Sequence, residues 1–244
     1  MRNVLITGGG KGLGRSIAKK FSSQGYTVYI NYLQDEASAN ETLQGIIESG
    51  GKAEIIQADV GKKEDINKMF AYLPGIDIFV HNAVYPVSAK AEEIQVDEWE
   101  KAVAVNASAL LYISQLVFPH MKSTGYGRIY GISSRGSKKG IPRYIGIGSA
   151  KAAMESIVRY LATEWGPYGI CANTISPGVM DTEAFRSVFP DADKRIEYTK
   201  RKAPLGQIVQ LEDVAELLLQ LSRPEMSMIT GQDIIMDGGY SLIT

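Results

Sequence analysis

Short runs of β-branched and aromatic residues alternate with longer segments of helical spacing along this chain of 244 residues. Seven of the short runs predict strands: Val4–Thr7, Thr27–Asn31, Ala53–Gln57, Ile76–Val80, Gly127–Ile132, Ile170–Ser176 and Gln232–Met236. Several are apolar on both faces, as parallel strands are when helices cover the sheet above and below. The alternation therefore predicts an α/β fold with a doubly wound parallel sheet and helices on both faces.

Six segments between the predicted strands have helical spacing: Leu13–Gln24, Ala37–Ser49, Glu64–Leu73, Asp97–Lys122, Tyr144–Trp165 and Leu211–Leu221. Asp181–Lys202 is polar and less regular, and we expect it to be a flexible lid. Neither a low-complexity linker nor an internal repeat interrupts the pattern. We therefore expect residues 1–244 to form a single domain.

Composition excludes several classes of function. The 26 basic and 27 acidic residues give a net charge of -1 and form no basic face, so no nucleic-acid partner is expected. The single cysteine, Cys171, fits a reducing compartment, and with two isolated histidines it predicts no metal site. Ala107–Phe118 is too short and too polar to span a membrane, and the first strand follows Met1 too closely for a signal peptide. We expect a cytoplasmic protein.

A glycine-rich turn, Thr7-Gly8-Gly9-Gly10-Lys11-Gly12-Leu13-Gly14, joins the first predicted strand to the first predicted helix. Glycines allow the backbone to turn tightly and to approach a pyrophosphate, whose charge the helix N-terminus favours. The spacing differs from the common Gly-x-Gly-x-x-Gly fingerprint, but its place between a strand and a helix predicts a dinucleotide site. The alternative is a merely tight turn.

Cofactor selectivity should be set about 20 residues beyond this loop, where the second strand ends. Asn31 stands there in place of the acidic residue that would bind the ribose hydroxyls of NAD and repel the extra phosphate of NADP. Lys11 adds a positive charge to the loop, whereas Gln34, Asp35 and Glu36 are poor phosphate ligands. On balance these residues favour NADPH over NADH.

Further motifs follow the loop in a fixed order. They are Asp59-Val60, Asn82-Ala83, Asn106, Ser133-Ser134, Lys151, Pro177-Gly178, Thr182, Gly231-Gln232 and Asp237-Gly238-Gly239. On these motifs the chain resembles the short-chain dehydrogenase/reductase family over essentially its whole length. The resemblance implies an oxidoreductase with a seven-stranded Rossmann-type sheet. It also implies a homo-oligomer, a tetramer or a dimer, packed through the helices near 97–122 and 144–165.

The resemblance also implies roles for individual residues. Asp59 and Val60 would contact the adenine, Asn82 and Ala83 would line the cofactor, and Lys151 would bind the nicotinamide ribose. The backbone after Pro177-Gly178, with Thr182, would hold the nicotinamide and its phosphates. The full cofactor set is then Gly8, Lys11, Gly12, Leu13, Gly14, Asn31, Asp59, Val60, Asn82, Ala83, Lys151, Pro177, Gly178, Val179 and Thr182.

One departure concerns the catalytic tyrosine. Most family members place it four residues before the lysine, where this chain has Ile147. The nearest upstream tyrosine is Tyr144, which gives a Tyr-x6-Lys spacing. That spacing is similar to that of enoyl-acyl-carrier-protein reductases, and the C-terminal motifs are most similar to the NADPH-dependent short-chain variant of those enzymes.

The spacing also has a physical interpretation. If Tyr144–Lys151 is helical, residues seven apart face nearly the same way as residues four apart. Moving the tyrosine from position 147 to position 144 then slides it about 4.5 Å along the helix axis. In enoyl reduction the negative charge collects on a thioester oxygen that lies farther from the carbon receiving hydride. A displaced proton donor suits that geometry.

The candidate catalytic residues are Tyr144, Lys151, Ser134 and Asn106. Tyr144 would donate a hydrogen bond or a proton to the enolate oxygen, and Lys151 would favour tyrosinate character as a nearby cation. Their alternatives are a packing tyrosine and a solvated helix lysine. Tyr85 is a second candidate tyrosine.

Two further candidates have structural alternatives. Ser134 would orient the substrate oxygen, although a capping role at the strand end is open and Ser133 is adjacent. The Asn106 side chain would hold a water in a proton relay, or would only mark a helix kink.

Three functions remain open from the sequence. The first is NADPH-dependent reduction of a 2-enoyl thioester, with acyl carrier protein as a possible partner. The second is reduction of a carbonyl in a 3-oxoacyl thioester or a secondary-metabolite ketone. The third is a protein that binds NADP(H) without turnover. Retention of Lys151, Ser134 and Asn106 disfavours this sensor, which would need few of them.

Overall fold

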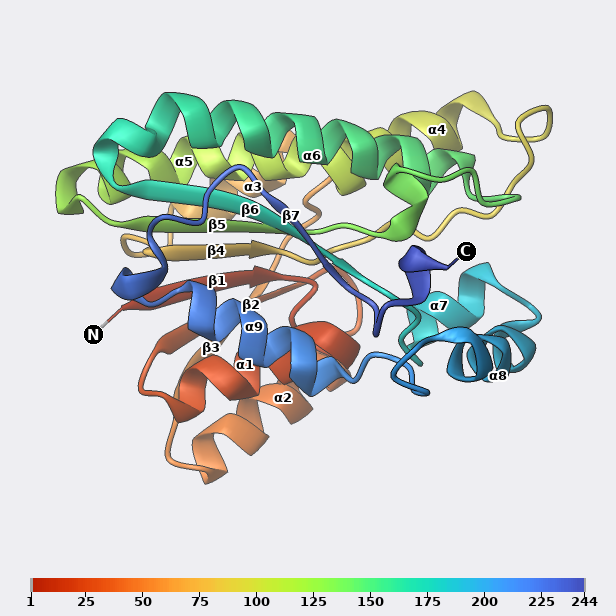
Figure 1. Ribbon diagram of the computed structural model, residues 1–244. Helices are drawn as coiled ribbons and strands as arrows, with labels where there is room; N and C mark the ends of the chain where they lie inside the picture. Colours follow the sequence, from red (N-terminus) through yellow and green to blue (C-terminus); the bar gives the residue numbers. More distant parts are fainter. Residues whose placement is uncertain (1, 244) are drawn as a thin grey trace.

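The computed structural model describes residues 2–243 and contains a seven-stranded sheet in which every neighbouring pair of strands is parallel (Figure 1). The strands are β1 (Asn3–Thr7), β2 (Thr27–Tyr32), β3 (Lys52–Gln57), β4 (Ile78–His81), β5 (Gly127–Ile132), β6 (Ile170–Pro177) and β7 (Asp233–Met236). Their order is β3-β2-β1-β4-β5-β6-β7. The order reverses between β1 and β4, as it does in a doubly wound Rossmann-type fold. The predicted fold class is confirmed.

Helices cover both faces of the sheet (Figure 1). On one face lie α1 (Gly12–Ser23), α2 (Glu36–Glu48) and α9 (Leu211–Leu221). On the other lie α3 (Lys63–Phe70), α4 (Val96–Val103), α5 (Ala109–Thr124) and α6 (Ile145–Trp165). Successive residues of a strand pack on opposite faces of the sheet. In β1, Val4 and Ile6 pack against the side covered by α1, α2 and α9, and Leu5 packs against the other side.

The segment expected as one helix, Asp97–Lys122, is divided by a π-helical turn at Ala104–Ser108. By length and composition alone, Val96–Thr124 passes as a membrane-spanning helix. Half of its most apolar window is buried inside the fold, however, and α5 packs beside β4 and β5 as a core helix does.

The expectation of an irregular lid at Asp181–Lys202 was wrong in its local structure. The segment forms α7 (Glu183–Val188) and α8 (Ala192–Lys202), which lie beyond the carboxyl ends of the strands (Figure 1). Thr182 caps α7, because its hydroxyl accepts a hydrogen bond from the Phe185 N–H at 3.1 Å. The segment is polar because most of its side chains are exposed, and only a narrow stripe that includes Val188 and Ile196 is buried.

Candidate active site

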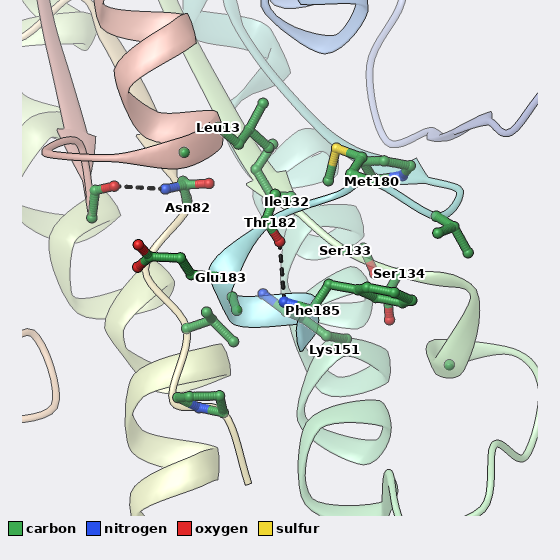
Figure 2. Close-up of a pocket in the computed structure, with 18 of the residues that line it drawn as sticks. Leu13, Asn82, Ile132, Ser133, Ser134, Lys151, Met180, Thr182, Glu183 and Phe185 are labelled. Carbon is green, nitrogen blue, oxygen red and sulfur yellow. Dashed lines mark hydrogen bonds between the residues drawn. The ribbon is translucent and has the colours of Figure 1, made fainter. Parts of the chain in front are cut away.

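A cleft of about 1650 Å³ runs along the carboxyl ends of the strands (Figure 2). It passes the switch point between β1 and β4, where open α/β sheets bind their ligands. It is lined by the glycine loop, by the ends of β2, β4, β5 and β6, and by α7 and α8. Every candidate site residue predicted from the sequence lines this cleft except Gly14 and Asn106, which lie just behind its wall.

The glycine loop has the backbone that a phosphate cradle requires. Gly8 and Gly12 have φ angles of +62° and +52°, which side chains disfavour. A Cβ at Gly14 would lie 2.1 Å from the Gly8 carbonyl oxygen, so close packing of α1 requires glycine there. A Cβ at Gly12 would meet nothing within 4 Å, so space is open at the first residue of α1. These features fit a dinucleotide pyrophosphate.

His81 and Thr7 fix the loop relative to β4. The His81 Nε2 lies 2.9 Å from the Val105 carbonyl, an acceptor only, so this nitrogen carries the proton. Nδ1 therefore accepts from the Thr7 hydroxyl at 3.0 Å. The same hydroxyl accepts from the backbone N–H groups of Asn82 and Ala83, each at 3.1 Å. Burial lowers the pKa of His81 to about 3, so the ring stays neutral.

Asn82 supports the loop through its side chain, which donates to the carbonyls of Thr7 and Gly8 at 3.2 and 2.9 Å. At the far side of the cleft, the Asp59 carboxylate accepts from the Gly61 N–H at 2.9 Å, and Val60 is buried in the core. These residues shape the wall where the adenosine of a dinucleotide would lie.

Lys11 is held between two carboxylates. Its ammonium lies 2.7 Å from Glu183 on α7 and 3.1 Å from Asp35, which precedes α2. The hydrogen bonds that the ammonium donates to Glu183 and, to a smaller extent, to Asp35 raise the pKa of Lys11. The Asn31 amide donates to the carbonyls of Ile56 and Ala58 at 3.3 and 3.1 Å. Asn31 is therefore tied to the end of β3, and Asp35 supplies the carboxylate at this corner.

Tyr144 and Ser134 meet inside the cleft. The Tyr144 hydroxyl donates to the Ser134 hydroxyl across 3.3 Å, and its ring stacks on Phe189 with centroids 5.8 Å apart. A Cβ at Gly136 would lie 2.5 Å from this ring, so glycine makes room for it. Burial raises the pKa of Tyr144, and the hydrogen bond to Ser134 opposes the rise.

Ile147 occupies the position where most family members carry the catalytic tyrosine. It is 2% exposed and belongs to an apolar cluster with Val87, Ala102 and Val188. The helix begins at Ile145, one residue later than expected, and Tyr144 is its N-cap. The Tyr144 carbonyl still accepts from the Gly148 N–H at 2.8 Å, so Tyr144 keeps its register with the first turn.

Arg143, just before Tyr144, has a φ of +64°. Within residues 2–243 it is the only residue other than glycine with a positive φ. Contacts from a distant loop hold it there. Its carbonyl accepts from the Ala89 N–H at 3.1 Å, and its guanidinium pairs with Glu93 at 3.1 Å. Such local strain is typical of functional sites, and here it directs the chain into Tyr144.

Lys151 lies on α6, 4% exposed, and its side chain is drawn with Ser133 and Ser134 in Figure 2. Burial lowers the pKa of Lys151 to about 8, and the negative charge of Glu155 opposes the shift. The two serines are distinct. Ser134 accepts from Tyr144, whereas the Ser133 hydroxyl donates to Glu155 at 2.6 Å.

Asn106 lies in the π-helical turn, fully buried. Its amide oxygen accepts from the Tyr85 N–H at 2.8 Å, and its amide nitrogen donates to the Tyr85 carbonyl at 3.3 Å. Both polar atoms of the side chain thus stabilise the loop after β4, which fits the helix-kink interpretation better than a water relay. Tyr85 itself lines the cleft, with the Lys101 ammonium 4.7 Å from its ring centroid.

The segment after β6 packs closely against the C-terminal strand. The Gly178 N–H donates to the Met236 carbonyl at 2.8 Å, and a Cβ at Gly178 would lie 2.9 Å from that of Asp237. The Val179 carbonyl accepts from the Val209 N–H at 3.1 Å. Pro177 ends β6, so the backbone expected to hold a nicotinamide is fixed on both sides.

Four residues in or around the site had no role predicted from the sequence: Glu155, Glu183, Phe189 and Arg143. Only Glu155 had a signal, because it follows Lys151 by one helical turn on the same face. Among the described residues, no group of three His, Cys, Asp or Glu side chains is placed to hold a metal ion.

The fold and the cleft define an oxidoreductase of the dinucleotide-binding type, and comparisons with known proteins agree. The family described as enoyl-(acyl carrier protein) reductase matches residues 8–241. A 3β-hydroxysteroid dehydrogenase of Eggerthella lenta is 32% identical, over 99% of this chain and 94% of that protein. The 1-cyclohexenylcarbonyl-CoA reductase of Streptomyces collinus is 29% identical, over 98% and 86%.

A solved structure is similar over the whole chain. The gluconate 5-dehydrogenase of Burkholderia cenocepacia, in complex with NADP and tartrate, superposes with a TM-score of 0.91. The two are 26% identical, and the match covers 100% of this chain and 96% of that one. The chain belongs to the short-chain dehydrogenase/reductase family.

Proposed function

We propose that this protein reduces the carbon–carbon double bond of a 2-enoyl thioester, with hydride delivered to Cβ. The observation that carries this proposal is the position of the hydroxyl that contacts Ser134 at the start of α6. That hydroxyl belongs to Tyr144, whereas position 147 is filled by an isoleucine packed in an apolar cluster.

Bound NAD(P)H would supply the hydride. The chain's own residues then manage the charge that the thioester acquires. As Cβ gains hydride, an electron pair moves to the thioester oxygen, and Tyr144 donates a hydrogen bond to that oxygen. Ser134 would orient the tyrosine hydroxyl. The Lys151 ammonium would add positive charge to the site where the thioester oxygen becomes negative. Protonation of the enolate at Cα by solvent restores the thioester carbonyl and completes the reduction.

The relatives support this reaction without being uniform. The matching family is described as an enoyl reductase. The S. collinus relative is named for a 1-cyclohexenylcarbonyl-CoA substrate, a thioester with a conjugated double bond. The E. lenta and B. cenocepacia relatives are dehydrogenases of hydroxyl groups. Carbonyl reduction is therefore the second candidate. The hydrogen bond between Tyr144 and Ser134, in the cleft that Lys151 also lines, disfavours a protein that only senses NADP(H).

NADPH is the proposed cofactor, with acyl carrier protein as the proposed carrier. Lys11 on the glycine loop favours a 2′-phosphate, although Asp35 and Glu183 reduce the net charge there, so we expect a modest preference. On the substrate side, Lys194 lines the cleft and α8 ends in Lys200-Arg201-Lys202, which suits an acidic carrier.

We also propose a cytoplasmic homo-oligomer. Tyr112 and Leu116 on α5 and Tyr160 on α6 are exposed on the helices that the resemblance assigns to subunit contacts. Light scattering that shows a stable monomer at micromolar concentration would contradict this assembly.

Parallel turnover assays test the reaction. Crotonyl and acetoacetyl thioesters, each on coenzyme A and on acyl carrier protein, are offered with NADPH, and NADPH consumption is followed. We expect turnover of the crotonyl thioester to exceed that of the acetoacetyl thioester. Turnover of acetoacetyl alone would replace the proposal with carbonyl reduction, and turnover of neither, with tight NADPH binding, would favour a sensor.

A further inference from the structure

Helix α6 buries two opposite charges one turn apart. Lys151 is 4% exposed and Glu155 is 6% exposed. Residues four apart on a helix are neighbours on one face. A buried charge without a partner is costly, whereas an opposite charge close by offsets much of that cost. The proposed chemistry does not use Glu155.

Ser133 fixes the carboxylate of Glu155. Its hydroxyl donates to the Glu155 Oε1 at 2.6 Å, inside the protein. Ser133 is itself held in place, because its backbone N–H donates to the Ile175 carbonyl on β6 at 2.7 Å. A hydrogen bond to a carboxylate favours its charged form. Two adjacent serines after β5 therefore have separate partners: Ser133 binds Glu155, and Ser134 binds Tyr144.

Other titratable groups near this face do not replace Glu155. His81 on β4 is neutral and has both ring nitrogens hydrogen-bonded. Tyr144 stands at the start of α6 and is protonated at neutral pH. Arg135 from the turn after β5 and Lys101 from α4 are cations that lie over the rings of Tyr240 and Tyr85. Within residues 2–243, Glu155 is the carboxylate whose charge acts on Lys151.

We propose that Glu155, held by Ser133, is the buried counter-ion that keeps Lys151 protonated in the active site. The proposal rests on the role of Lys151 in the proposed function, whichever bond is reduced. Glu155 acts through Lys151 and is a positioning residue. Without its charge, the ammonium would face a neutral, dehydrated surrounding and would lose its proton at a lower pH.

The first test separates the charge of Glu155 from its hydrogen bond. Glu155→Gln removes the charge and keeps an oxygen that accepts from Ser133, whereas Ser133→Ala removes the hydrogen bond and keeps the charge. We expect the alkaline limb of the kcat/KM profile to move about one pH unit lower in Glu155→Gln. A smaller shift is expected in Ser133→Ala. Limbs that coincide with the wild type in a folded Glu155→Gln would overturn the proposal.

The second test needs neither turnover nor a variant of Glu155. Lys151→Met leaves the carboxylate without its counter-ion, so protonation of Glu155 should then stabilise the folded protein. As the pH falls from about 7 to about 5, the free energy of unfolding of Lys151→Met should rise relative to that of the wild type. Parallel pH dependences of the two proteins would show that Glu155 and Lys151 are not coupled. Because this readout is stability, it stands even if the enoyl thioester is not the substrate.

Discussion

The hydroxyl of Tyr144 lies 3.3 Å from the hydroxyl of Ser134, across the cleft wall formed by the end of β5 and the start of α6. This contact places the tyrosine beside the proposed catalytic serine although it stands seven residues before Lys151 rather than four. The position four residues before Lys151 holds Ile147, which packs among apolar side chains. Under the proposed function, Tyr144 takes the role that a tyrosine at position 147 has in most family members.

Removal of the Tyr144 hydroxyl should abolish most of the activity. Tyr144→Phe keeps the ring that stacks on Phe189 and loses the donor to the substrate oxygen. Loss of one such donor typically lowers kcat by about 10²–10³, roughly 3–4 kcal/mol of transition-state stabilisation. NADPH affinity, measured by fluorescence titration, should barely change. Near-normal kcat would exclude Tyr144 and make Tyr85 the next candidate.

Restoring the common spacing should not restore activity. Ile147→Tyr in the Tyr144→Phe background places a phenol where a buried isoleucine packs against Val87 and Val188. The larger side chain overpacks this cluster and its hydroxyl is not aligned with a thioester oxygen. We expect little recovery of enoyl reduction and a trace of ketone reduction. Full recovery would mean that the position of the tyrosine does not select the reaction.

The space beneath the Tyr144 ring can be tested with a matched pair of substitutions. Gly136→Ala would place a Cβ 2.5 Å from the ring, whereas Gly140→Ala, in the same loop, would meet nothing within 4 Å. We expect a decrease in kcat of tenfold or more for Gly136→Ala, on the order of 1.4 kcal/mol, and no change for Gly140→Ala. Equal kcat values in the two variants would show that the ring position is not critical.

The pKa of Lys151 makes activity and stability respond to pH in opposite directions. Burial lowers this pKa from 10.5 to about 8, so the folded protein binds its proton more weakly than the unfolded chain does. Stability should therefore rise with pH between about 8 and 10.5, while kcat/KM falls as the ammonium is lost. Denaturant titrations of wild type and Lys151→Met check the first part. We expect the increase in stability with pH to be absent from Lys151→Met. If the increase persists in the variant, another titrating group causes it.

Selectivity for the cofactor should depend on the charges around Lys11. Lys11→Ala removes a charge-assisted contact to a 2′-phosphate, and we expect kcat/KM with NADPH to fall about tenfold while that with NADH changes little. Asp35→Asn releases Lys11 from one carboxylate and should raise the preference for NADPH. A wild-type kcat/KM that is higher with NADH than with NADPH would contradict the proposed preference for NADPH.

The sequence predicted the sheet well because its strands are apolar on both faces and lie between helices of clear periodicity. It could not predict the π-helical turn, which depends on the pairing of Asn106 with the backbone of Tyr85, a residue distant in the chain. The helices α7 and α8 were not predicted because the segment is strongly polar and α8 buries only a narrow stripe. Contacts made in three dimensions were also hidden. Lys11 reads as a free charge in the sequence, and only the fold brings Asp35 and Glu183 to it.

The fate of a labelled hydride tests the central claim most directly. NADPH carrying deuterium at both C4 positions of the nicotinamide is incubated with the protein and crotonyl thioester, and the product is analysed by mass spectrometry and NMR. Reduction of the double bond predicts a butyryl thioester with one deuterium at Cβ and a solvent-derived hydrogen at Cα. The opposite result is an unchanged crotonyl thioester, together with deuterium on the carbinol carbon when acetoacetyl thioester is supplied. That outcome would make the protein a carbonyl reductase with a displaced tyrosine.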